Sequence, residues 1–144
     1  MERHRGQPLN LFLDACALIY RFEGADTFRQ ATARLLRELT RGSTTKARVA
    51  VSRLSMLECR GKPLRENDLQ TLKRYDHFFS EIEIVEIDAT VIELATRLRA
   101  LHGLKTPDAI QAASALVWQA DALFVTADAA FEKTPNLNVR LIRV

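Results

Sequence analysis

The sequence contains few of the residues that mark disulfide frameworks, linkers or repeats. Two cysteines in 144 residues do not make a disulfide framework, and Cys16 and Cys59 are expected to be buried, reduced thiols. The five glycines and four prolines are scattered, without a repeat or a linker rich in serine, glycine or proline. With 47% hydrophobic and 27% charged residues, the chain has the composition of one globular domain, expected to span residues 1–144.

Long apolar runs are also missing, which argues against a transmembrane segment. The run LNLFLDACALIY follows Arg3, His4 and Arg5 and resembles a signal peptide, but Asp14 interrupts it and no convincing cleavage site follows. We therefore interpret this run as a core strand and helix. No other stretch approaches the length of a membrane span, so the sequence predicts a soluble, cytoplasmic protein.

Charge of one sign is not in large excess, because the formal net charge is only +3. The arginines crowd the first half of the chain, where Arg34, Arg37 and Arg41 fall on one helical face. Such a face could follow the phosphates of a nucleic acid, although a solvated helix face is the commoner meaning. The basic residues that follow this face are Arg48, Arg53, Arg60, Lys62 and Arg65.

The most informative stretch is residues 106–131, which is predicted to form a helix, a strand and a turn. Thr106 is a good N-cap, Pro107 suits the first helical position, and Asp108 lies in the first turn, near the positive end of the helix dipole. Residues 109–118 are apolar on almost every side, which predicts a helix buried in the middle of the domain.

The second half of this stretch is predicted to be an internal strand. Residues 122–125 form a short apolar run, as is typical of a buried parallel strand. Asp128 comes just past the end of this run. The stretch therefore places one carboxylate at the start of a buried helix and another after a buried strand.

Strands and helices are predicted to alternate along the rest of the chain. Further strands are expected at residues 9–13, 48–51, 82–87 and 139–142. Helices are expected at residues 15–22, 26–41, 53–60, 65–79 and 89–102, with Asp14, Asp26, Ser52 and Asp88 as N-caps and Gly61, Pro63 and Gly103 as terminators. This order predicts an α/β fold, a three-layer α/β/α sandwich with a central parallel sheet. In such sheets ligands bind beyond the carboxyl ends of the strands.

Four carboxylates are expected to converge at that edge of the sheet. Asp14 and Asp128 follow strands, Glu58 lies on the helix after the second strand, and Asp108 begins the buried helix. Such a cluster would repel itself unless a divalent cation neutralised it. Because no histidine or thiolate cluster has the spacing of a zinc site, the all-oxygen set favours Mg²⁺ or Mn²⁺. Metal-assisted hydrolysis of a phosphodiester is the chemistry that such a site performs best.

Each of these acids also has an ordinary structural interpretation. An aspartate after a strand and before a helix is a common N-cap, and Asp88 has that setting without any reason to be catalytic. The prediction of a metal site therefore depends on the joint pattern of the four acids.

That joint pattern resembles the PIN-domain family, and within it the small VapC-like ribonuclease toxins of bacterial toxin–antitoxin pairs. The segment TPDAIQAASALVWQADALFVTADAAF is similar to the family's helix with Asp-Ala-x-x-Ala-Ala-x-Ala, followed by a strand ending in Thr-x-Asp and then Phe. LFLDACALIY matches the first strand with its acid, and SRLSMLECR places Glu58 at the family's second acid. The resemblance implies that Asp14, Glu58, Asp108 and Asp128 bind the metal, and that Thr126 is a hydroxyl residue beside them.

The function that this resemblance implies is a Mg²⁺-dependent endoribonuclease, with Mn²⁺ as a possible substitute. It also implies an RNA substrate, a small antitoxin partner and a homodimer. Two alternatives stay open, a PIN module that binds RNA or protein without cutting, and a PIN nuclease acting on precursor RNA or structured DNA.

One position departs from the family pattern. The family frequently has Asn or Ser two residues after the first acid, where this chain has Cys16. An oxidation-sensitive site is one interpretation of Cys16 and Cys59, and simple packing is the commoner one. His4, His77 and His102 are expected to be surface or partly buried residues.

Overall fold

The computed structural model describes residues 8–43 and 45–144, and its five strands form one parallel sheet in the order β3-β2-β1-β4-β5. The strands are β1 (Asn10–Leu13), β2 (Arg48–Ser52), β3 (Glu83–Val85), β4 (Leu123–Thr126) and β5 (Asn138–Leu141). The helices are α1 (Ala15–Glu23), α2 (Asp26–Thr40), α3 (Arg53–Arg65), α4 (Leu69–Ser80), α5 (Ala89–His102), α6 (Thr106–Trp118) and the short 3₁₀ helix η1 (Ala129–Lys133). Arg3, His4 and Arg5 lie outside the described residues.

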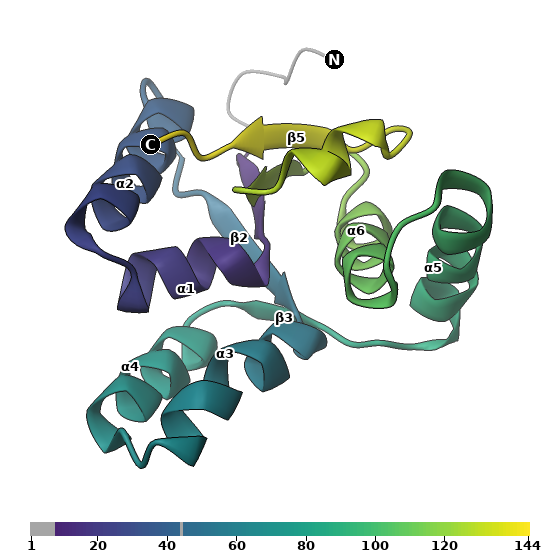
Figure 1. Cartoon of the computed structure of the whole chain (residues 1–144). Helices are drawn as coiled ribbons and strands as arrows, with labels where there is room; N and C mark the ends of the chain where they lie inside the picture. Colours follow the sequence, from purple (N-terminus) through teal and green to yellow (C-terminus); the bar gives the residue numbers. More distant parts are fainter. Residues whose placement is uncertain (1–7, 44) are drawn as a thin grey trace.

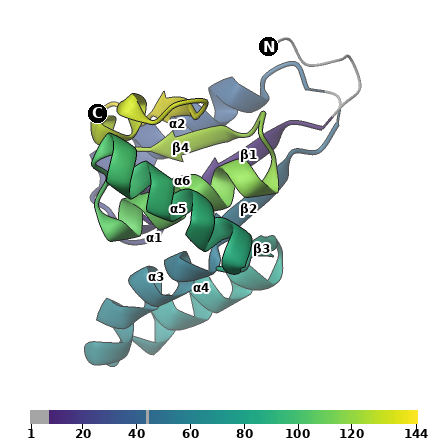
Figure 2. The same cartoon turned by 90° about the vertical axis from the view of Figure 1, so that its right-hand side faces the viewer.

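Helices cover both faces of this sheet, which confirms the predicted three-layer α/β/α sandwich (Figure 1). α5 and α6 lie on one face, α1 and α2 lie on the other, and α3 and α4 extend together from the edge that carries β3 (Figure 2). Within the part of the chain that the structure describes, no helix is both long and apolar enough to cross a membrane.

The central strands are apolar on both faces because each face carries its own hydrophobic cluster. Phe12 and Phe124 belong to the cluster under α5 and α6, and their rings stack with centroids 5.7 Å apart. The next residue of each strand, Leu13 and Val125, belongs to the second cluster, under α1 to α4. This double burial is why the strands lack an alternating pattern in the sequence.

Several of the predicted helix ends are confirmed in atomic detail. The side chains of Asp14, Ser52 and Asp88 accept hydrogen bonds from the first turns of α1, α3 and α5. Gly103 ends α5 in the left-handed conformation at φ 71°, which favours glycine. The prediction that α6 is buried is also confirmed, since Ala109, Gln111, Ala112, Ala113, Ser114 and Ala115 are all buried.

The predicted end of α3 at residue 60 is wrong, because the helix continues through Gly61 and Pro63 to Arg65. A proline inside a helix costs about 3 kcal/mol relative to alanine. Pro63 is buried, so this cost is offset by packing that the local sequence does not reveal. The turn comes later, at Asn67 with φ 54°, and α4 begins at Leu69 rather than at residue 65.

Two of the predicted N-caps are also wrong. Asp26 and Thr106 are each the first residue of their helix, and the N-cap positions belong to Ala25 and Lys105. Neither of these two N-cap residues makes a capping hydrogen bond with its side chain. The Asp26 carboxylate instead forms an ion pair with Arg29 on the surface of α2.

Candidate active site

Asp14 is held rigidly at the carboxyl end of the central strand β1. Its backbone N–H donates to the carbonyl of Val125 at 3.0 Å, which ties it to β4. One carboxylate oxygen accepts from the Ala15 N–H at 2.8 Å, and the other accepts from the Thr126 hydroxyl at 2.8 Å and the Cys16 thiol at 3.0 Å. The side chain is buried, and burial raises its pKa although these hydrogen bonds oppose the shift.

Thr126 links Asp14 to Asp128 at the end of β4. Its hydroxyl donates to Asp14 and accepts from the backbone N–H of Asp128 at 3.1 Å. Asp128 is exposed, and its carboxylate accepts from the Ala130 N–H at 2.9 Å, which caps η1. The predicted hydroxyl residue therefore fixes the backbone that carries one acid and binds the side chain of another.

Glu58 is positioned by a residue that sequence reasoning missed. The side-chain amide of Gln111, on α6, donates to Oε1 of Glu58 at 3.0 Å and to Oγ of Ser55 at 2.9 Å. Gln111 is only 1% exposed. A buried polar residue in the apolar segment 109–118 was the available signal, because a buried amide needs partners.

Asp108 lies half-buried in the first turn of α6, as predicted. Burial raises the pKa of this carboxyl, and the nearby Asp14 and Asp128 raise it further. Lys105 and Lys133 act in the opposite direction. Asp108 and Asp128 line the same pocket, of about 250 Å³, with these two lysines.

Contacts connect the four predicted acids at the carboxyl edge of the sheet. Thr126 joins Asp14 to Asp128, Asp128 and Asp108 line one pocket, and Gln111 joins the helix of Asp108 to Glu58. Burial is the largest cause of the raised pKa of Glu58, and repulsion by Asp14 and Asp108 adds to it. Asp128 likewise raises the pKa of Asp14 and of Asp108. Among residues 8–43 and 45–144, however, no three His, Cys, Asp or Glu side chains are close enough together to form a ready-made metal site.

The donor set nevertheless fits a hard divalent cation. All four side chains offer carboxylate oxygens, the ligands that Mg²⁺ and Mn²⁺ prefer. Their mutual repulsion would be relieved by a positive charge between them. The pKa shifts and the ligand chemistry therefore point to the same kind of ion.

Cys16 occupies the position where the family pattern frequently has a polar residue, and it contacts the site directly. Its thiol donates a hydrogen bond to the Asp14 carboxylate. The sulfur also lies 3.3 Å from the Thr126 hydroxyl and accepts a hydrogen bond from the Ala127 N–H at 3.3 Å. Burial and the charge of Asp14 raise the pKa of the thiol to about 12. Both cysteines are free, as predicted, but only Cys59 is buried, since Cys16 is partly exposed. His77 and His102 are exposed.

Three of the basic residues singled out in the first half of the chain form ion pairs outside this site. Arg48 pairs with Glu83, Arg53 with Glu86, and Arg60 lies 3.6 Å from Asp76. Such exposed pairs contribute little to stability.

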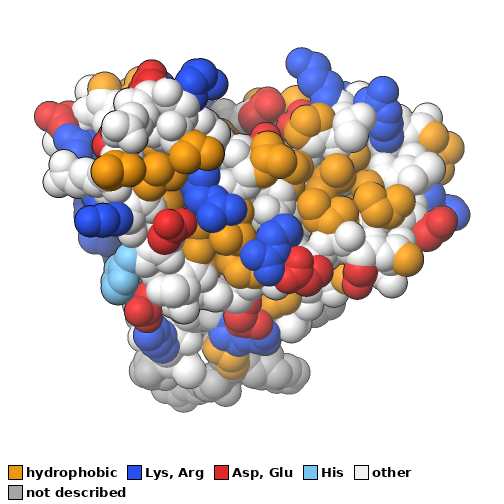
Figure 3. Space-filling view, turned by 90° about the horizontal axis from the view of Figure 1, so that it is seen from below, with side chains coloured by type: hydrophobic (Ala, Val, Ile, Leu, Met, Phe, Trp, Pro, Cys, Tyr) orange, Lys and Arg blue, Asp and Glu red, His pale blue; other side chains and the backbone are white. Residues whose placement is uncertain are grey.

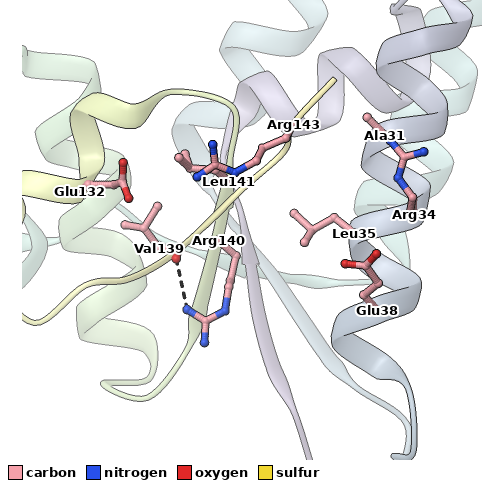
Figure 4. Close-up of a pocket in the computed structure, with 9 residues that line it drawn as sticks. All are labelled: Ala31, Arg34, Leu35, Glu38, Glu132, Val139, Arg140, Leu141 and Arg143. Carbon is pink, nitrogen blue, oxygen red and sulfur yellow. Dashed lines mark hydrogen bonds between the residues drawn. The ribbon is translucent and has the colours of Figure 1, made fainter.

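Arg34 instead lines a cleft of about 450 Å³ between α2 and the C-terminal segment (Figure 4). Arg140 and Arg143 approach this cleft from the opposite side, together with Glu132, while Glu38 shares the α2 side. None of the four predicted acids lines it, so the larger cleft is separate from the candidate active site.

Comparison with known proteins identifies relatives of this architecture. The PIN domain family model matches residues 11–137. No curated protein matches the sequence. Among solved structures, VapBC2 of Rickettsia felis bound to a promoter DNA fragment has a TM-score of 0.70 at 21% identity, covering 94% of this chain and 100% of that one.

Two further solved structures are similar over nearly the whole chain. A toxin–antitoxin complex of Klebsiella pneumoniae has a TM-score of 0.69 at 22% identity, covering 92% of this chain and 98% of that one. VapBC-5 of Mycobacterium tuberculosis has a TM-score of 0.59 at 22% identity, covering 95% and 100%. At these identities the likeness establishes a shared fold.

Proposed function

The chain belongs to the PIN domain family, and we propose that it is a Mg²⁺-dependent endoribonuclease that serves as the toxin of a toxin–antitoxin pair. The observation that carries this proposal is the contacts that connect Asp14, Glu58, Asp108 and Asp128, through Thr126, Gln111 and the pocket that Asp108 and Asp128 share. A cluster of like charges at the edge of a stable fold is costly unless it has a function.

In the proposed site, Asp14, Glu58 and Asp108 would hold the metal directly or through water, and Asp128 would hold a second ion or orient the attacking water. The bound ion, Mg²⁺ or Mn²⁺, supplies charge stabilisation on the phosphate and a more acidic water. Asp14 is suited to a fixed ligand position because three donors hold its carboxylate. Glu58 is restrained by Gln111 alone among these contacts.

Asp128 is suited to orient water because it is exposed and, among the described residues, its carboxylate accepts a hydrogen bond from Ala130 alone. Thr126 keeps its backbone in place. In-line attack on the phosphodiester would leave a 5′-phosphate on one product and a 3′-hydroxyl on the other. The side chains therefore divide between holding charge and orienting the nucleophile.

We propose that a small antitoxin and a second copy of the chain are partners, in a cytoplasmic setting. The similar structure from Klebsiella pneumoniae is described as a toxin–antitoxin complex, and that from Mycobacterium tuberculosis as a member of the VapBC family of toxin–antitoxin systems. The face on the side of α3 and α4 carries hydrophobic patches between charged side chains (Figure 3). Leu57 and Leu64 on α3 are each 69% exposed and lie seven residues apart, on one side of the helix. Sedimentation of the purified chain tests the homodimer.

The direct test of the enzyme is a cleavage assay with Mg²⁺ or Mn²⁺ titrated into the metal-free protein. Single-stranded RNA, structured precursor RNA and DNA are compared as substrates. Metal-dependent RNA fragments support the proposal, and fragments from DNA alone would move the activity to another substrate. Retention of nucleic acid without fragments would make the chain a binding module, which the presence of all four acids argues against.

A further inference from the structure

Two lysines face the candidate active site without a partner of their own. Lys105 precedes α6, and Lys133 ends η1. Across residues 8–43 and 45–144, neither ammonium group forms a salt bridge within 4.0 Å or a hydrogen bond. Arg48, Arg53 and Arg60, by contrast, are paired with acids.

Both lysines are attached to firmly anchored backbone. Lys105 follows Leu104, which is 3% exposed and whose carbonyl accepts from the Arg99 side chain at 3.2 Å. Lys133 lies two residues after Phe131, which is 1% exposed and packs on Phe124 with ring centroids 4.7 Å apart. The two positive charges are therefore kept near the acids even though their side chains are exposed.

The space between the lysines is a pocket of about 250 Å³ that opens beside Asp108 and Asp128. Leu104 and Phe131 form its apolar wall. Pockets for drug-sized molecules measure about 300–1,000 Å³, so this one suits a smaller group. An anionic group in this pocket would contact the ammonium groups of both lysines. The next group along the same ligand would then lie beside Asp108 and Asp128.

We propose that Lys105 and Lys133 bind the phosphate group next to the scissile phosphodiester of a single-stranded RNA. This inference rests on the proposed nuclease function and adds a binding subsite to it. A nucleic acid strand fits better than an acidic peptide, because successive phosphates occur at every nucleotide. One phosphate at the four acids with their metal necessarily brings the next one close.

The alternative role for the lysines is to neutralise the acids. The two roles differ in what a neutral substitution changes. A substrate-binding lysine supports RNA affinity and its salt dependence, whereas a neutralising lysine offsets the negative charge of the acids and so weakens their affinity for a metal ion. The substitutions Lys105→Gln and Lys133→Gln separate these roles, singly and together.

The matched control is Lys46→Gln. Lys46 is exposed and precedes β2, so it lies toward the opposite, amino-terminal edge of the sheet. Each variant is measured with a fluorescein-labelled single-stranded RNA in saturating Mg²⁺. Anisotropy gives Kd at several salt concentrations in an Asp14→Asn background, and cleavage by the otherwise wild-type chain gives kcat and KM.

We expect Kd and KM to rise roughly two- to fivefold per lysine, as for the loss of an exposed ion pair, while kcat changes little. The slope of log Kd against log salt should fall by about 0.7 for each lysine removed. Lys46→Gln should behave like the wild type. Rescue by Lys→Arg at either position is expected, because arginine also binds phosphate.

Unchanged Kd, KM and salt slope in the double variant overturn the inference while RNA cleavage by the wild type still supports the enzyme. A higher Mg²⁺ affinity in a metal titration, with unchanged RNA affinity, assigns the lysines to charge neutralisation, and weaker antitoxin binding alone assigns them to the partner; both overturn it too. If the wild type binds RNA without cutting, the proposed nuclease fails, and the lysine contacts are still decided by Kd. A wild type that neither binds nor cuts RNA overturns both proposals.

Discussion

The buried amide of Gln111 donates a 3.0 Å hydrogen bond to Glu58 and thereby joins α6 to α3 across the candidate active site. Its second donor contact, to Ser55, fixes the direction of the amide. The other end of the same side chain, Oε1, is buried without a hydrogen-bond partner among the described residues. A buried acceptor without a partner lowers stability. The presence of Gln111 in the core is therefore better explained by its hydrogen bond to Glu58 than by a contribution to stability.

Replacing this residue should therefore weaken metal binding more than it weakens the fold. For Gln111→Leu we expect the Mg²⁺ concentration for half-maximal cleavage to rise about 10–100-fold, as is common when a partner of a metal ligand is lost. The free energy of unfolding should change by no more than about 1 kcal/mol, because an unsatisfied acceptor is removed together with the hydrogen bonds. Metal titration and urea unfolding measure the two effects.

Gln70→Leu is the matched control, since Gln70 is an exposed glutamine on α4. It should leave the metal dependence unaltered. Equal metal dependence in Gln111→Leu and the wild type would show that Glu58 needs no restraint from α6.

Asp14→Asn is expected to abolish cleavage and to stabilise the protein. Burial raises the pKa of Asp14, so its ionised form at neutral pH destabilises the fold, whereas the amide carries no charge. In the absence of metal, the free energy of unfolding should rise by about 0.5–2 kcal/mol, as at other functional sites. Asp88→Asn is the control, because Asn caps a helix as well as Asp does and Asp88 caps α5 away from the other acids. A cleaving Asp14→Asn protein would refute the assigned ligand.

Stability without metal should increase as the pH is lowered from about 7 toward about 5. The pKa values of Asp14, Glu58 and Asp108 are raised in the folded chain. Protonation of such groups favours the folded state, so their contribution is fully present below the unfolded pKa and is lost as the pH rises through the folded pKa. Thermal unfolding in EDTA at several pH values measures this trend.

The control for this trend is a triple variant with the substitutions Asp14→Asn, Glu58→Gln and Asp108→Asn. Its stability should vary less over the same pH range. Added Mg²⁺ should stabilise the wild type more at about pH 7 than at about pH 5, because protons compete with the ion for the carboxylates. A wild type that is less stable at the lower pH would contradict the shifts.

Cys16 should react slowly with iodoacetamide at neutral pH. Its pKa is raised to about 12, so very little of the nucleophilic thiolate is present. In a Cys59→Ser background, labelling should be much slower in the folded protein than in urea, and Asp14→Asn should accelerate it by removing a negative charge. Mass spectrometry follows the reaction. Rapid labelling of the folded wild type would instead favour an oxidation-sensitive site.

The parts of the fold that depend on contacts between residues close in the sequence could be predicted. Asp14, Ser52 and Asp88 cap the helices that follow them because a side-chain oxygen and the first-turn N–H groups are close in the chain. Pro63 lies beyond such reasoning, since its burial decides whether α3 continues. Local propensity suggested a stop there, and tertiary packing overrode it.

The acids of the candidate site could be proposed in advance because each follows a recognisable strand or helix start. Gln111, the partner of Glu58, could not be proposed, and Thr126 was expected beside the acids only from the family resemblance. Gln111 lies 53 residues from Glu58, and Thr126 lies 112 residues from Asp14. Contacts over such separations depend on which strands become neighbours, and β4 pairs with β1 only because the chain crosses the sheet. Lys105 and Lys133 likewise gain meaning only from the pocket that they share.

The pairing of β4 with β1 also affects when the candidate active site can form during synthesis of the chain. β1 leaves the ribosome before both of its neighbours in the sheet, β2 on one side and β4 on the other. Until β4 emerges, Asp14 lacks both the Val125 carbonyl and the Thr126 hydroxyl, and Asp128 does not yet exist in the chain. Nascent domains fold as units during synthesis at about 5–20 residues per second. A nascent chain is therefore unable to assemble the four acids until β4 and Asp128 have been synthesised.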